Sequence, residues 1–536
     1  MSLAAQLLFS VLFAFAASVN HIDDTDETYG YYEPIHYLLY GVGMQTWEYS
    51  PEYSIRSYAF LAPFAAVGVV LKSAGFTKLQ IFYGIRLLLS QFMAFALTSV
   101  VHESNKYFGS QRCRYLIATL LCCPGLFFCS TALLPSAVGC ALVALAVSSF
   151  MAYRHGYTIM YGCLAVLWSG WPFIGLIFLP LGLIILYREY HKSGLAGVAS
   201  ITAVGIFHLV VVSGAVLAID SYYYGRRTFP PLNILLYNAI SGNGDELYGI
   251  EPASYYVKNL LLTIGLSFPL ALLEIGLFTL DVFYHTLASR ENLDSSRMLT
   301  EFGVCMCAVL WAGVLFSRPH KEERFFYPIY PVLCFLSALA LVRLENGVVF
   351  VVSLVVSKRT AGAGISGDKN SGFLTASFVL LAGMTVSRVF ALYNNYSGYL
   401  QVWQHLQDNV EGVSAPVNIC MGSDWYTFPS HFFVPEPLRL QYISDGFGGV
   451  LPQHFAPQNG TSCEPLQPFN DQNREETCRY IDWSQCDYLV RTMKDDDRNN
   501  DKDKVYFDRS IFDPLFSAKI IDSAKSPILT RAFSIP

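Results

Sequence analysis

Residues 21–58, between two apolar runs, gather side chains suited to proton transfer. Four carboxylates fall within five positions, namely Asp23, Asp24, Asp26 and Glu27. Glu33, His36 and Glu48 follow among many aromatic residues. Carboxylates at a dry apolar boundary have a raised proton affinity, which suits a general base, and aromatic faces suit a sugar ring or an isoprenoid chain. A solvated acidic loop with an interfacial aromatic belt has the same composition, so both interpretations stay open on these residues alone.

A second polar group lies in the turn at 317–324, between two apolar runs. Its sequence is SRPHKEER, in which His320, Lys321 and Arg324 supply potential cations. Cations at the start of a helix gain nothing from the helix dipole, so we expect an anionic partner such as a lipid phosphate at headgroup depth. Internal pairing with the two neighbouring glutamates is the alternative, and the two interpretations can coexist.

The third polar stretch is the loop 220–256, which begins DSYYYGRR and contains Tyr223, Arg226 and Arg227. Two arginines at the end of an apolar run can clamp a phosphate. They are also suited to anchoring a span at the interface, and we favour that second role for them.

The composition defines the class of protein that must position these loops. Of 536 residues, 53% are hydrophobic and only 14% are charged, whereas about a quarter of a soluble domain is charged. We therefore predict an α-helical polytopic membrane protein with about eleven spans. The apolar runs are 3–19, 59–71, 81–101, 116–134, 137–151, 159–187 (broken at Trp171-Pro172), 198–219, 260–280, 303–316, 325–344 and 373–392. The first run also fits a cleaved signal peptide, and either interpretation carries residues 20–58 across the membrane.

Lysine and arginine placement indicates the sides of the membrane. The predicted cytoplasmic loops contain Lys72, Lys78, Arg188, Lys192, Arg290, Arg297, Arg343, Lys358 and Arg359. Lys106, Arg112, Arg114 and Arg154 fall on the far side and conflict with the rule. The loops 20–58, 220–256 and 317–324 share the far side with the sequons at Asn395 and Asn459, where glycan acceptors belong.

Hydropathy falls after about residue 392, while Pro, Asp, Asn and Gln increase. We therefore divide the chain into a multi-span membrane domain, 1–392, and a far-side C-terminal α/β domain, 393–536. Four of the 13 cysteines lie in the second part, Cys420, Cys463, Cys478 and Cys486. They can pair in about three ways if all are bridged, and no CxxC motif indicates a zinc site.

Two charged residues, Arg86 and Glu274, fall inside apolar runs. Charges in such positions are by default functional or paired. We expect Arg86 to extend to the cytoplasmic end of its span, whereas Glu274 has no partner that the sequence identifies.

Several strings resemble the family 22 glycosyltransferases, the mannosyltransferases that depend on dolichyl-phosphate-mannose. The first loop, DDTDETYGYYEPIHYLLYGVGMQTWEYSPEYSIRSY, and the turn SRPHKEERFFYPIYP carry this resemblance. The strings YYEPIHYLLYG, QTWEYSP, DSYYYG, LNILLYN, WYTFPS and NDQNREETCRYID are more narrowly similar to the α-1,2-mannosyltransferases of asparagine-linked glycan assembly. Gly30 stands where this family usually has Asn or Gln, and Ala253 where an aromatic residue is usual. Residues after Asn499 match nothing in the family.

The resemblance implies a GT-C fold in the endoplasmic reticulum membrane, with the active site and the C-terminal domain in the lumen. It also implies transfer of mannose, with inversion, from dolichyl-phosphate-mannose to a lipid-linked oligosaccharide. Inversion needs one base, for which we choose Asp26, with Glu27 orienting or replacing it. The leaving phosphate needs fixed positive donors, for which His320, Lys321 and Arg324 are the candidates.

Further residues of the loops are candidates for binding the acceptor or the donor lipid. They are Glu33, His36, Gln45, Trp47, Glu48, Tyr223 and Arg226. Because a lipid phosphate is already a good leaving group, no cofactor or metal is required, although the acidic cluster can also be interpreted as a site for a divalent cation.

Two alternatives remain. A transporter places ionisable residues near the bilayer midplane and shows internal repeats, whereas here the polar residues are concentrated in loops at one face. Within the family, the alternatives are the α-1,6-mannosyltransferase of the same pathway and a mannosyltransferase acting on glycolipid anchors. These share the acidic loop and the His-Lys-Glu motif but not the QTWEYSP and NDQN strings.

Overall fold

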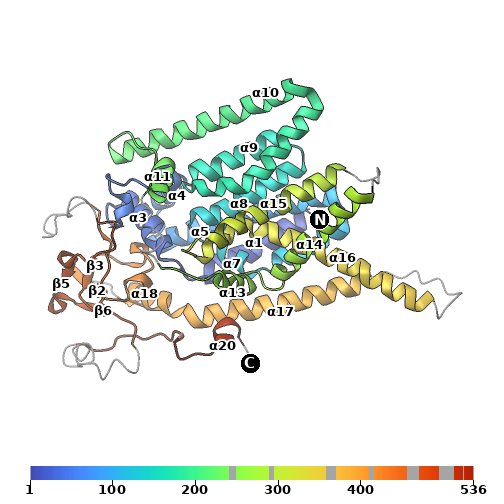
Figure 1. Cartoon of the computed structure of the whole chain (residues 1–536). Coiled ribbons are helices and arrows are strands. Elements are labelled where there is room, and N and C mark those ends of the chain that lie inside the picture. The colour runs from blue at the N-terminus through green and yellow to red at the C-terminus, as the bar shows by residue number, and fades with distance from the viewer. Residues whose placement is uncertain are drawn as a thin grey trace.

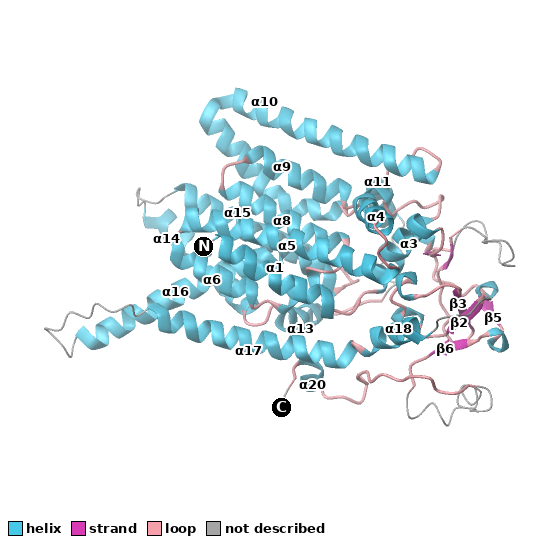
Figure 2. Cartoon of the chain, turned by 180° about the vertical axis from the view of Figure 1, so that it is seen from behind, coloured by secondary structure: helices cyan, strands magenta, loops and turns pink. Residues whose placement is uncertain are grey.

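Apolar helices make up most of the chain, and a small sheet stands at one end of them (Figure 1). The structure, a computed structural model, describes residues 2–240, 249–288, 295–357, 370–409, 416–455, 470–493, 512–522 and 524–534. Seen from behind, the same long helices lie together, and the strands again stand apart from them (Figure 2).

Among the described residues, six helices are long and apolar enough to cross a membrane, and three shorter ones are apolar. The helices are α1 (Ser2–Val19), α2 (Thr25–Glu27), α3 (Glu33–Tyr40), α4 (Tyr58–Ser73), α5 (Lys78–Phe108), α6 (Ser110–Leu121), α7 (Pro124–Cys129), α8 (Pro135–Met151), α9 (His155–Cys163), α10 (Gly175–Tyr224), α11 (Pro230–Ile240), α13 (Ala253–Thr263), α14 (Ser267–Ala288), α15 (Ser295–Ser317), α16 (Tyr330–Ser357), α17 (Asn370–Tyr396), α18 (Gly398–Asn409) and α20 (Ile528–Ala532). The chain is thus a multi-pass membrane protein, and α1 packs along α5 in the bundle.

The predicted run 159–187 is two helices rather than one. The chain breaks at Trp171-Pro172, as the sequence indicates, and α9 and α10 meet where Gly162 faces the ring of Phe178. A second break divides α10 at Gly194, whose φ of 63° favours a residue without a Cβ. The chain folds back sharply there (Figure 1).

The structure corrects the predicted position of α4. This helix does not separate its flanking loops, because Lys72 Nζ donates to the Leu39 carbonyl and Lys78 pairs with Glu436 of the C-terminal part. Lys78 starts α5, so the 31 residues of α5 carry Lys106 to the opposite end of the bundle.

The cations that conflicted with the charge rule gather at this opposite end. Lys106 and Arg154 both contact Glu103, and Arg297 donates to the Tyr107 carbonyl. Lys72 and Lys78 therefore lie at one end of the bundle, and Lys106 and Arg154 lie at the other end beside Arg297, which differs from the grouping that the sequence predicts.

The two charged residues within apolar runs are paired. Arg86 is buried and donates to the backbone carbonyls of Asn20 and His21, so it fixes the end of α1 rather than reaching the cytoplasm as predicted. Glu274 lies 2.9 Å from Arg343 of α16, the partner that the sequence did not identify.

The C-terminal part from residue 393, here called the tail, carries a four-stranded parallel sheet in the order β5-β3-β2-β6. These strands are β2 (Val417–Met421), β3 (Leu438–Ile443), β5 (Tyr480–Ile481) and β6 (Tyr488–Val490). The sheet confirms a small α/β unit, and a disulfide joins Cys420 to Cys486. Cys478 is also disulfide-bonded, while Cys463 lies outside the described residues.

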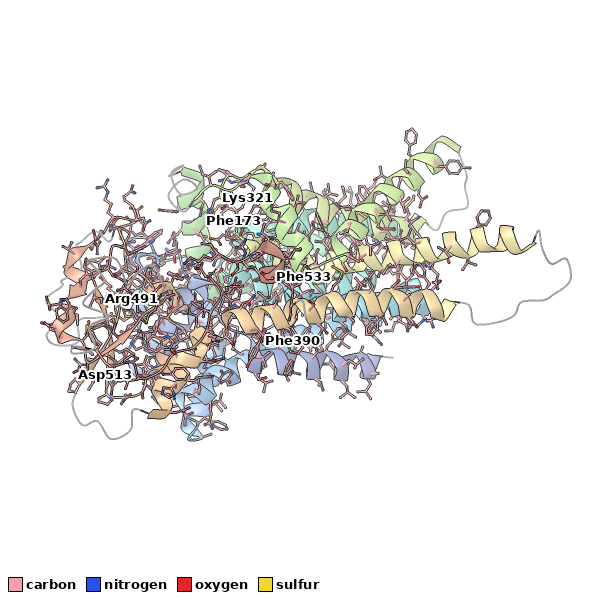
Figure 3. The ribbon with its side chains drawn as sticks, turned by 90° about the horizontal axis from the view of Figure 1, so that it is seen from below. Phe173, Lys321, Phe390, Arg491, Asp513 and Phe533 are labelled. Carbon is pink, nitrogen blue, oxygen red and sulfur yellow. A yellow bond between two sulfur atoms is a disulfide. The ribbon has the colours of Figure 1, made fainter. Side chains whose placement is uncertain are left out.

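The tail packs against the first loop. Strand β1 (Met44–Gln45) pairs with β4 (Gln453–His454), and Thr28 donates to the carbonyls of Phe428 and Pro429. Viewed from below, Arg491 and Asp513 lie at the tail end, whereas Phe390 lies along α17 (Figure 3). The contacts between the first loop and the tail enclose the cavity described next.

Candidate active site

A cavity of about 850 Å³ opens where the three predicted polar stretches meet the tail. Its polar lining comes from the first loop and the 317–324 hairpin, with α11 and the tail completing the walls. Two contacts join the second and third stretches, because His320 Nδ1 lies 3.0 Å from the Gly249 carbonyl and Glu251 N donates to the Pro319 carbonyl. The three stretches that the sequence predicts on one side of the membrane therefore lie together at this cavity.

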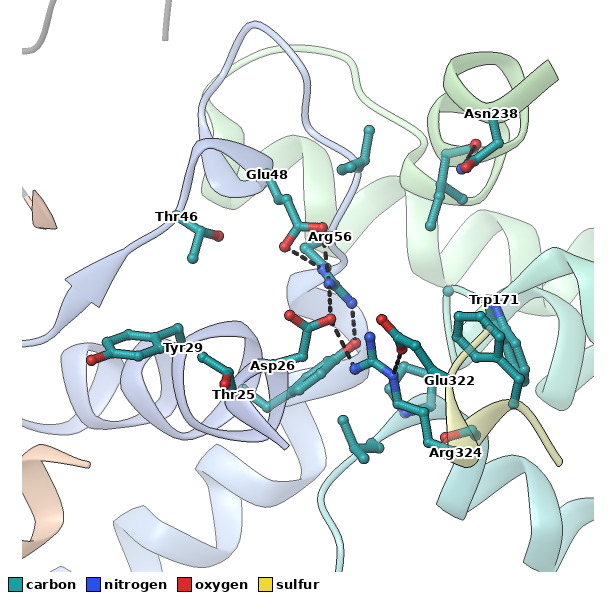
Figure 4. Close-up of a pocket in the computed structure, with 18 of the residues that line it drawn as sticks. Thr25, Asp26, Tyr29, Thr46, Glu48, Arg56, Trp171, Asn238, Glu322 and Arg324 are labelled. Carbon is teal, nitrogen blue, oxygen red and sulfur yellow. Dashed lines mark hydrogen bonds and ion pairs between the residues drawn. The ribbon is translucent and has the colours of Figure 1, made fainter. Parts of the chain in front are cut away.

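Asp26 lies at the centre of the cavity's polar wall (Figure 4). The one-turn helix α2 presents it, and Asp24 caps that helix by accepting the Asp26 N–H. Asp26 Oδ2 lies 2.7 Å from Arg56 Nη2 and 2.9 Å from Arg324 Nη1. One carboxylate oxygen therefore holds two guanidinium groups.

Arg56 links Asp26 to the rest of the first loop. Its guanidinium also contacts both carboxylate oxygens of Glu48, at 2.9 and 2.8 Å, and donates to the Tyr31 hydroxyl. The end of α10 fixes its backbone, because the Tyr224 hydroxyl donates to the Arg56 carbonyl at 2.7 Å. Sequence reasoning missed Arg56, since a single arginine at the end of an acidic loop carries no spacing signal.

Asp220 supports the same turn from α10. Its Oδ1 accepts the N–H groups of Tyr58 and Ala59, and its Oδ2 accepts the Ser57 hydroxyl. The carboxylate is buried and caps the start of α4 from a distant part of the chain. The residue that follows Arg56 is thereby fixed in place.

The two guanidinium groups determine the protonation state of Asp26. Burial alone raises the pKa of a carboxyl group, but the charges of Arg324 and Arg56 outweigh it and hold the pKa of Asp26 well below its ordinary value. Burial raises the pKa of Asp24 to about 7 despite Arg324, and it raises the pKa of Glu48 as well. Asp26 therefore stays ionised throughout the neutral range.

The hairpin supplies cations of two kinds. Arg324, His320 and Arg318 line the cavity, and Glu322 receives both Arg324 Nε and, at 3.0 Å, His320 Nε2. Lys321 is buried away from the lining and its Nζ donates to the Arg318 and Pro319 carbonyls. Arg324 and His320 are thus paired inside the turn through Glu322, whereas Lys321 is held by backbone carbonyls and by neither glutamate.

Glu27 does not face the cavity. It is buried, accepts the Leu133 N–H at 3.1 Å, and has a pKa that burial raises to about 7. The contact joins the acidic turn to the segment between α7 and α8, which suits Glu27 to orienting Asp26.

Glu33 and His36 also lie outside the cavity, in a buried contact with the tail. Glu33 accepts the Ser430 hydroxyl, the His431 N–H and the Met44 N–H. His36 Nδ1 contacts the Val42 carbonyl. These residues hold the tail against the first loop.

The remaining predicted residues divide between the cavity and its surroundings. Trp47 and Glu48 line the cavity. Gln45 donates to the Tyr49 carbonyl, Tyr223 stacks on Tyr58, and Arg226 donates to Glu52 O and Ser54 Oγ. Arg226 therefore stabilises the first loop. This role differs from both predicted ones, the phosphate clamp and the interfacial anchor.

Two further predictions concern the sequons and a divalent cation at the acidic cluster. Asn395 is half-buried beside the Thr530 and Arg531 carbonyls, and Asn459 lies outside the described residues. Within the described ranges, no group of three or more His, Cys, Asp or Glu is arranged to hold a metal ion. Two guanidinium groups instead lie among the carboxylates that the sequence offered for a cation.

The fold is of the GT-C type. The structure is similar to that of ArnT from Cupriavidus metallidurans bound to undecaprenyl phosphate, with a TM-score of 0.51, 13% identity, and coverage of 83% of this chain and 85% of that one. At this identity the likeness concerns the fold.

The sequence identifies the family within this class. The profile of the Alg9-like mannosyltransferase family matches residues 4–435, and the chain belongs to that family. It is 35% identical to alpha-1,2-mannosyltransferase ALG9 of Mus musculus, over 97% of this chain and 84% of the relative. It is 32% identical to ALG9 of Saccharomyces cerevisiae, over 99% and 91% of the two chains. The protein is therefore a mannosyltransferase, and the transporter alternative is set aside.

Proposed function

We propose that this protein transfers mannose in α-1,2 linkage, with inversion, from dolichyl-phosphate-mannose to a lipid-linked oligosaccharide. The relatives named above are alpha-1,2-mannosyltransferases, and the structure of similar fold holds a polyprenyl phosphate. The observation that carries the proposal is the contact of Asp26 with Arg56 and Arg324 inside the cavity. This contact supports the proposal because it brings a carboxylate suited to act as the base together with two guanidinium groups suited to bind a phosphate.

Asp26 acts as the base. Its carboxylate takes the proton of the acceptor hydroxyl while that oxygen bonds to the anomeric carbon of the donor mannose. The bond from that carbon to the phosphate oxygen breaks, and its electron pair leaves with the dolichyl phosphate. Attack from the face opposite the phosphate inverts the anomeric centre.

Arg56 and Arg324 act on the donor phosphate, with His320 and Arg318 beside them. Guanidinium groups bind phosphate as they bind carboxylate, so an arriving phosphate competes with Asp26 for both. Loss of these partners frees Asp26 and raises its proton affinity. Donor binding therefore activates the base, and the released guanidinium groups stabilise the departing phosphate.

We place the cavity and the tail on the lumenal side of the endoplasmic reticulum membrane. We infer eleven crossings, formed by α1, α5, the pair α6–α7, α8, α9, the two arms of α10, α14, α15, α16 and α17. The number equals the predicted one because the loss of α4 is balanced by the division of run 159–187. With this arrangement Lys106, Arg112 and Arg154 fall on the cytoplasmic side, as the charge rule requires.

The experiment that tests the acceptor is depletion of the protein followed by profiling of the lipid-linked oligosaccharides that accumulate. The proposal predicts an intermediate that awaits an α-1,2-linked mannose. The purified protein should elongate this intermediate with dolichyl-phosphate-mannose. Accumulation of an intermediate awaiting an α-1,6-linked mannose, or of a glycolipid-anchor precursor, would replace it with another member of the family.

A further inference from the structure

The cavity has two unlike poles on either side of Asp26. In Figure 4, Tyr29 and Thr46 lie on one side of the Asp26–Arg56–Arg324 group, and Trp171 lies on the other. The Trp171 pole consists of membrane helices and their ends. The Tyr29 pole faces the tail, because the Tyr29 hydroxyl donates to the Trp425 carbonyl at 2.8 Å.

The Trp171 pole suits a lipid. The ring centre of Trp171 lies 5.4 Å from that of Trp311 and 5.8 Å from that of Phe325, the residue after Arg324. Leu176 and Val314 continue this apolar wall and are each 37% exposed. A polyprenyl chain reaches the phosphate-binding arginines from the bilayer along this side.

The Tyr29 pole is a platform of aromatic rings held by the tail. Trp425 lies 5.4 Å from Tyr29 and 5.3 Å from Phe447. The Phe447 carbonyl accepts the Tyr480 hydroxyl, which ties the platform to the end of strand β5. Trp425 and Phe447 both line the cavity and are only half-buried.

The platform begins beside the base. Tyr29 follows Asp26 by three residues in a continuous helical segment, so the two side chains occupy the same face one turn apart. In-line displacement places the attacking hydroxyl opposite the leaving phosphate. A donor entering from the Trp171 pole therefore leaves the Tyr29 pole for the acceptor.

We infer that Trp425 and Phe447 form a sugar-binding subsite that holds the acceptor oligosaccharide by stacking against its mannose rings. Flat aromatic faces match the apolar C–H faces of pyranose rings. This assignment rests on the proposed function, which supplies an oligosaccharide as the second substrate. Phe447 and the wall residues Leu451 and Asn473 all belong to the tail. The tail thus provides the part of the cavity wall that we assign to the acceptor.

The test compares two aromatic residues of the tail in the full-length purified protein. Phe447→Ala removes a ring from the cavity wall, whereas Tyr426→Ala removes a ring that is 51% exposed and does not line the cavity. We expect Phe447→Ala to raise KM for the lipid-linked oligosaccharide about ten-fold, equivalent to ~1.4 kcal/mol, with KM for dolichyl-phosphate-mannose changing less than about two-fold. Tyr426→Ala should change neither value.

A second measurement uses a soluble, lipid-free oligomannose as the probe, without donor, in titration calorimetry. Wild-type protein should bind it, and Phe447→Ala should weaken binding by the same factor. Phe447→Leu keeps an apolar side chain but removes the flat aromatic face. If stacking is responsible, this variant should weaken binding as Phe447→Ala does. It also replaces Phe447→Ala if that variant does not fold.

Unchanged acceptor KM in Phe447→Ala and Phe447→Leu, or an equal rise in both KM values, would overturn the subsite while leaving the proposed function intact. Absence of mannose transfer by the wild-type protein would instead overturn the proposed function. In that case the titration with oligomannose still decides whether the platform binds sugar.

Discussion

Arg56 Nη2 lies 2.7 Å from Asp26 Oδ2 although 30 positions separate the two residues in the chain. The same oxygen lies 2.9 Å from Nη1 of Arg324, almost 300 positions further on. The first loop and the hairpin therefore meet at a single atom. A phosphate that takes over the two N–H donors now held by Asp26 would displace its carboxylate, which gives an anionic substrate a defined point of entry.

Removal of either arginine should weaken the use of the donor. We expect Arg56→Ala and Arg324→Ala each to raise KM for dolichyl-phosphate-mannose roughly ten- to hundred-fold, the range for a hydrogen bond to a charged group. Lys321→Ala is the matched control, because Lys321 donates to backbone carbonyls and does not line the cavity. Steady-state kinetics with each substrate varied separately measures the effect. An equal or larger increase in Lys321→Ala would move the phosphate site away from Arg56 and Arg324.

The carboxylate of Asp220 should matter through Arg56. Asp220→Ala removes the cap of α4, which should cost about 1 kcal/mol of stability, and it loosens the turn that carries Arg56. We expect a lower unfolding temperature together with a higher KM for the donor and little change in KM for the acceptor. Substitution by Asn, which keeps one accepting oxygen, should restore part of both. A fall in stability with unchanged kinetics would limit Asp220 to a structural role.

The contact between the first loop and the tail should be sensitive to acid. Burial, with the nearby charge of His431, lowers the pKa of His36 to about 3 and that of His454 to about 4, both below the ordinary value near 6.5. Both histidines are neutral in the folded protein, and the unfolded chain binds more protons below pH 6.5. Their contribution to stability is therefore full above pH 6.5 and falls as the pH decreases toward 4.

Glu33 acts in the same direction at lower pH. Burial raises the pKa of Glu33, but the charge of His431 outweighs burial and lowers this pKa to about 2. The contribution of Glu33 to stability is therefore full above its ordinary pKa near 4.5 and falls below that pH.

Thermal unfolding of the purified protein between pH 7.5 and 4.5 should show a steady decrease in unfolding temperature. His36→Gln with His454→Gln should flatten the curve, and an equally steep curve in this double variant would contradict the assignment.

The placement of the tail in the lumen predicts its modification. Glycosidase treatment should increase the gel mobility of the protein made in microsomes, and combined Asn395→Gln and Asn459→Gln substitutions should remove the shift. Single substitutions show which sequon is used. A protein without any glycosidase-sensitive shift would place the tail on the other side or leave both sequons unmodified, and protease protection of the tail in sealed microsomes separates these outcomes.

The contact between Asp26 and the hairpin was predictable because short motifs encode it. Carboxylates cluster after one apolar run, and cations cluster between two others. These two clusters together indicate a shared site at which the opposite charges meet. Arg56 carries no such signal, since its partners Asp26, Glu48 and Tyr31 come together around it only after folding.

The errors at Lys72, Lys78 and Arg86 share one physical cause. Hydropathy measures burial in an apolar environment but not direction. Hydropathy therefore predicts a span at α4, although packing turns this helix back toward the first loop. It also predicts that Arg86 extends to the end of its span, although Arg86 binds the carbonyls of Asn20 and His21. The aromatic wall at Phe447 was also invisible, because the tail approaches the cavity only through its contacts with the first loop.

The central claim is that Asp26 is the base, and mannose transfer by Asp26→Asn tests it most directly. Asn keeps the size of the side chain but cannot accept a proton, so the transfer rate at saturating dolichyl-phosphate-mannose and acceptor should fall by roughly 10²–10⁴-fold. Glu27→Gln should lose far less, because Glu27 faces Leu133 and not the cavity. A rate in Asp26→Asn within a few-fold of the wild type, with Glu27→Gln inactive, would contradict the account.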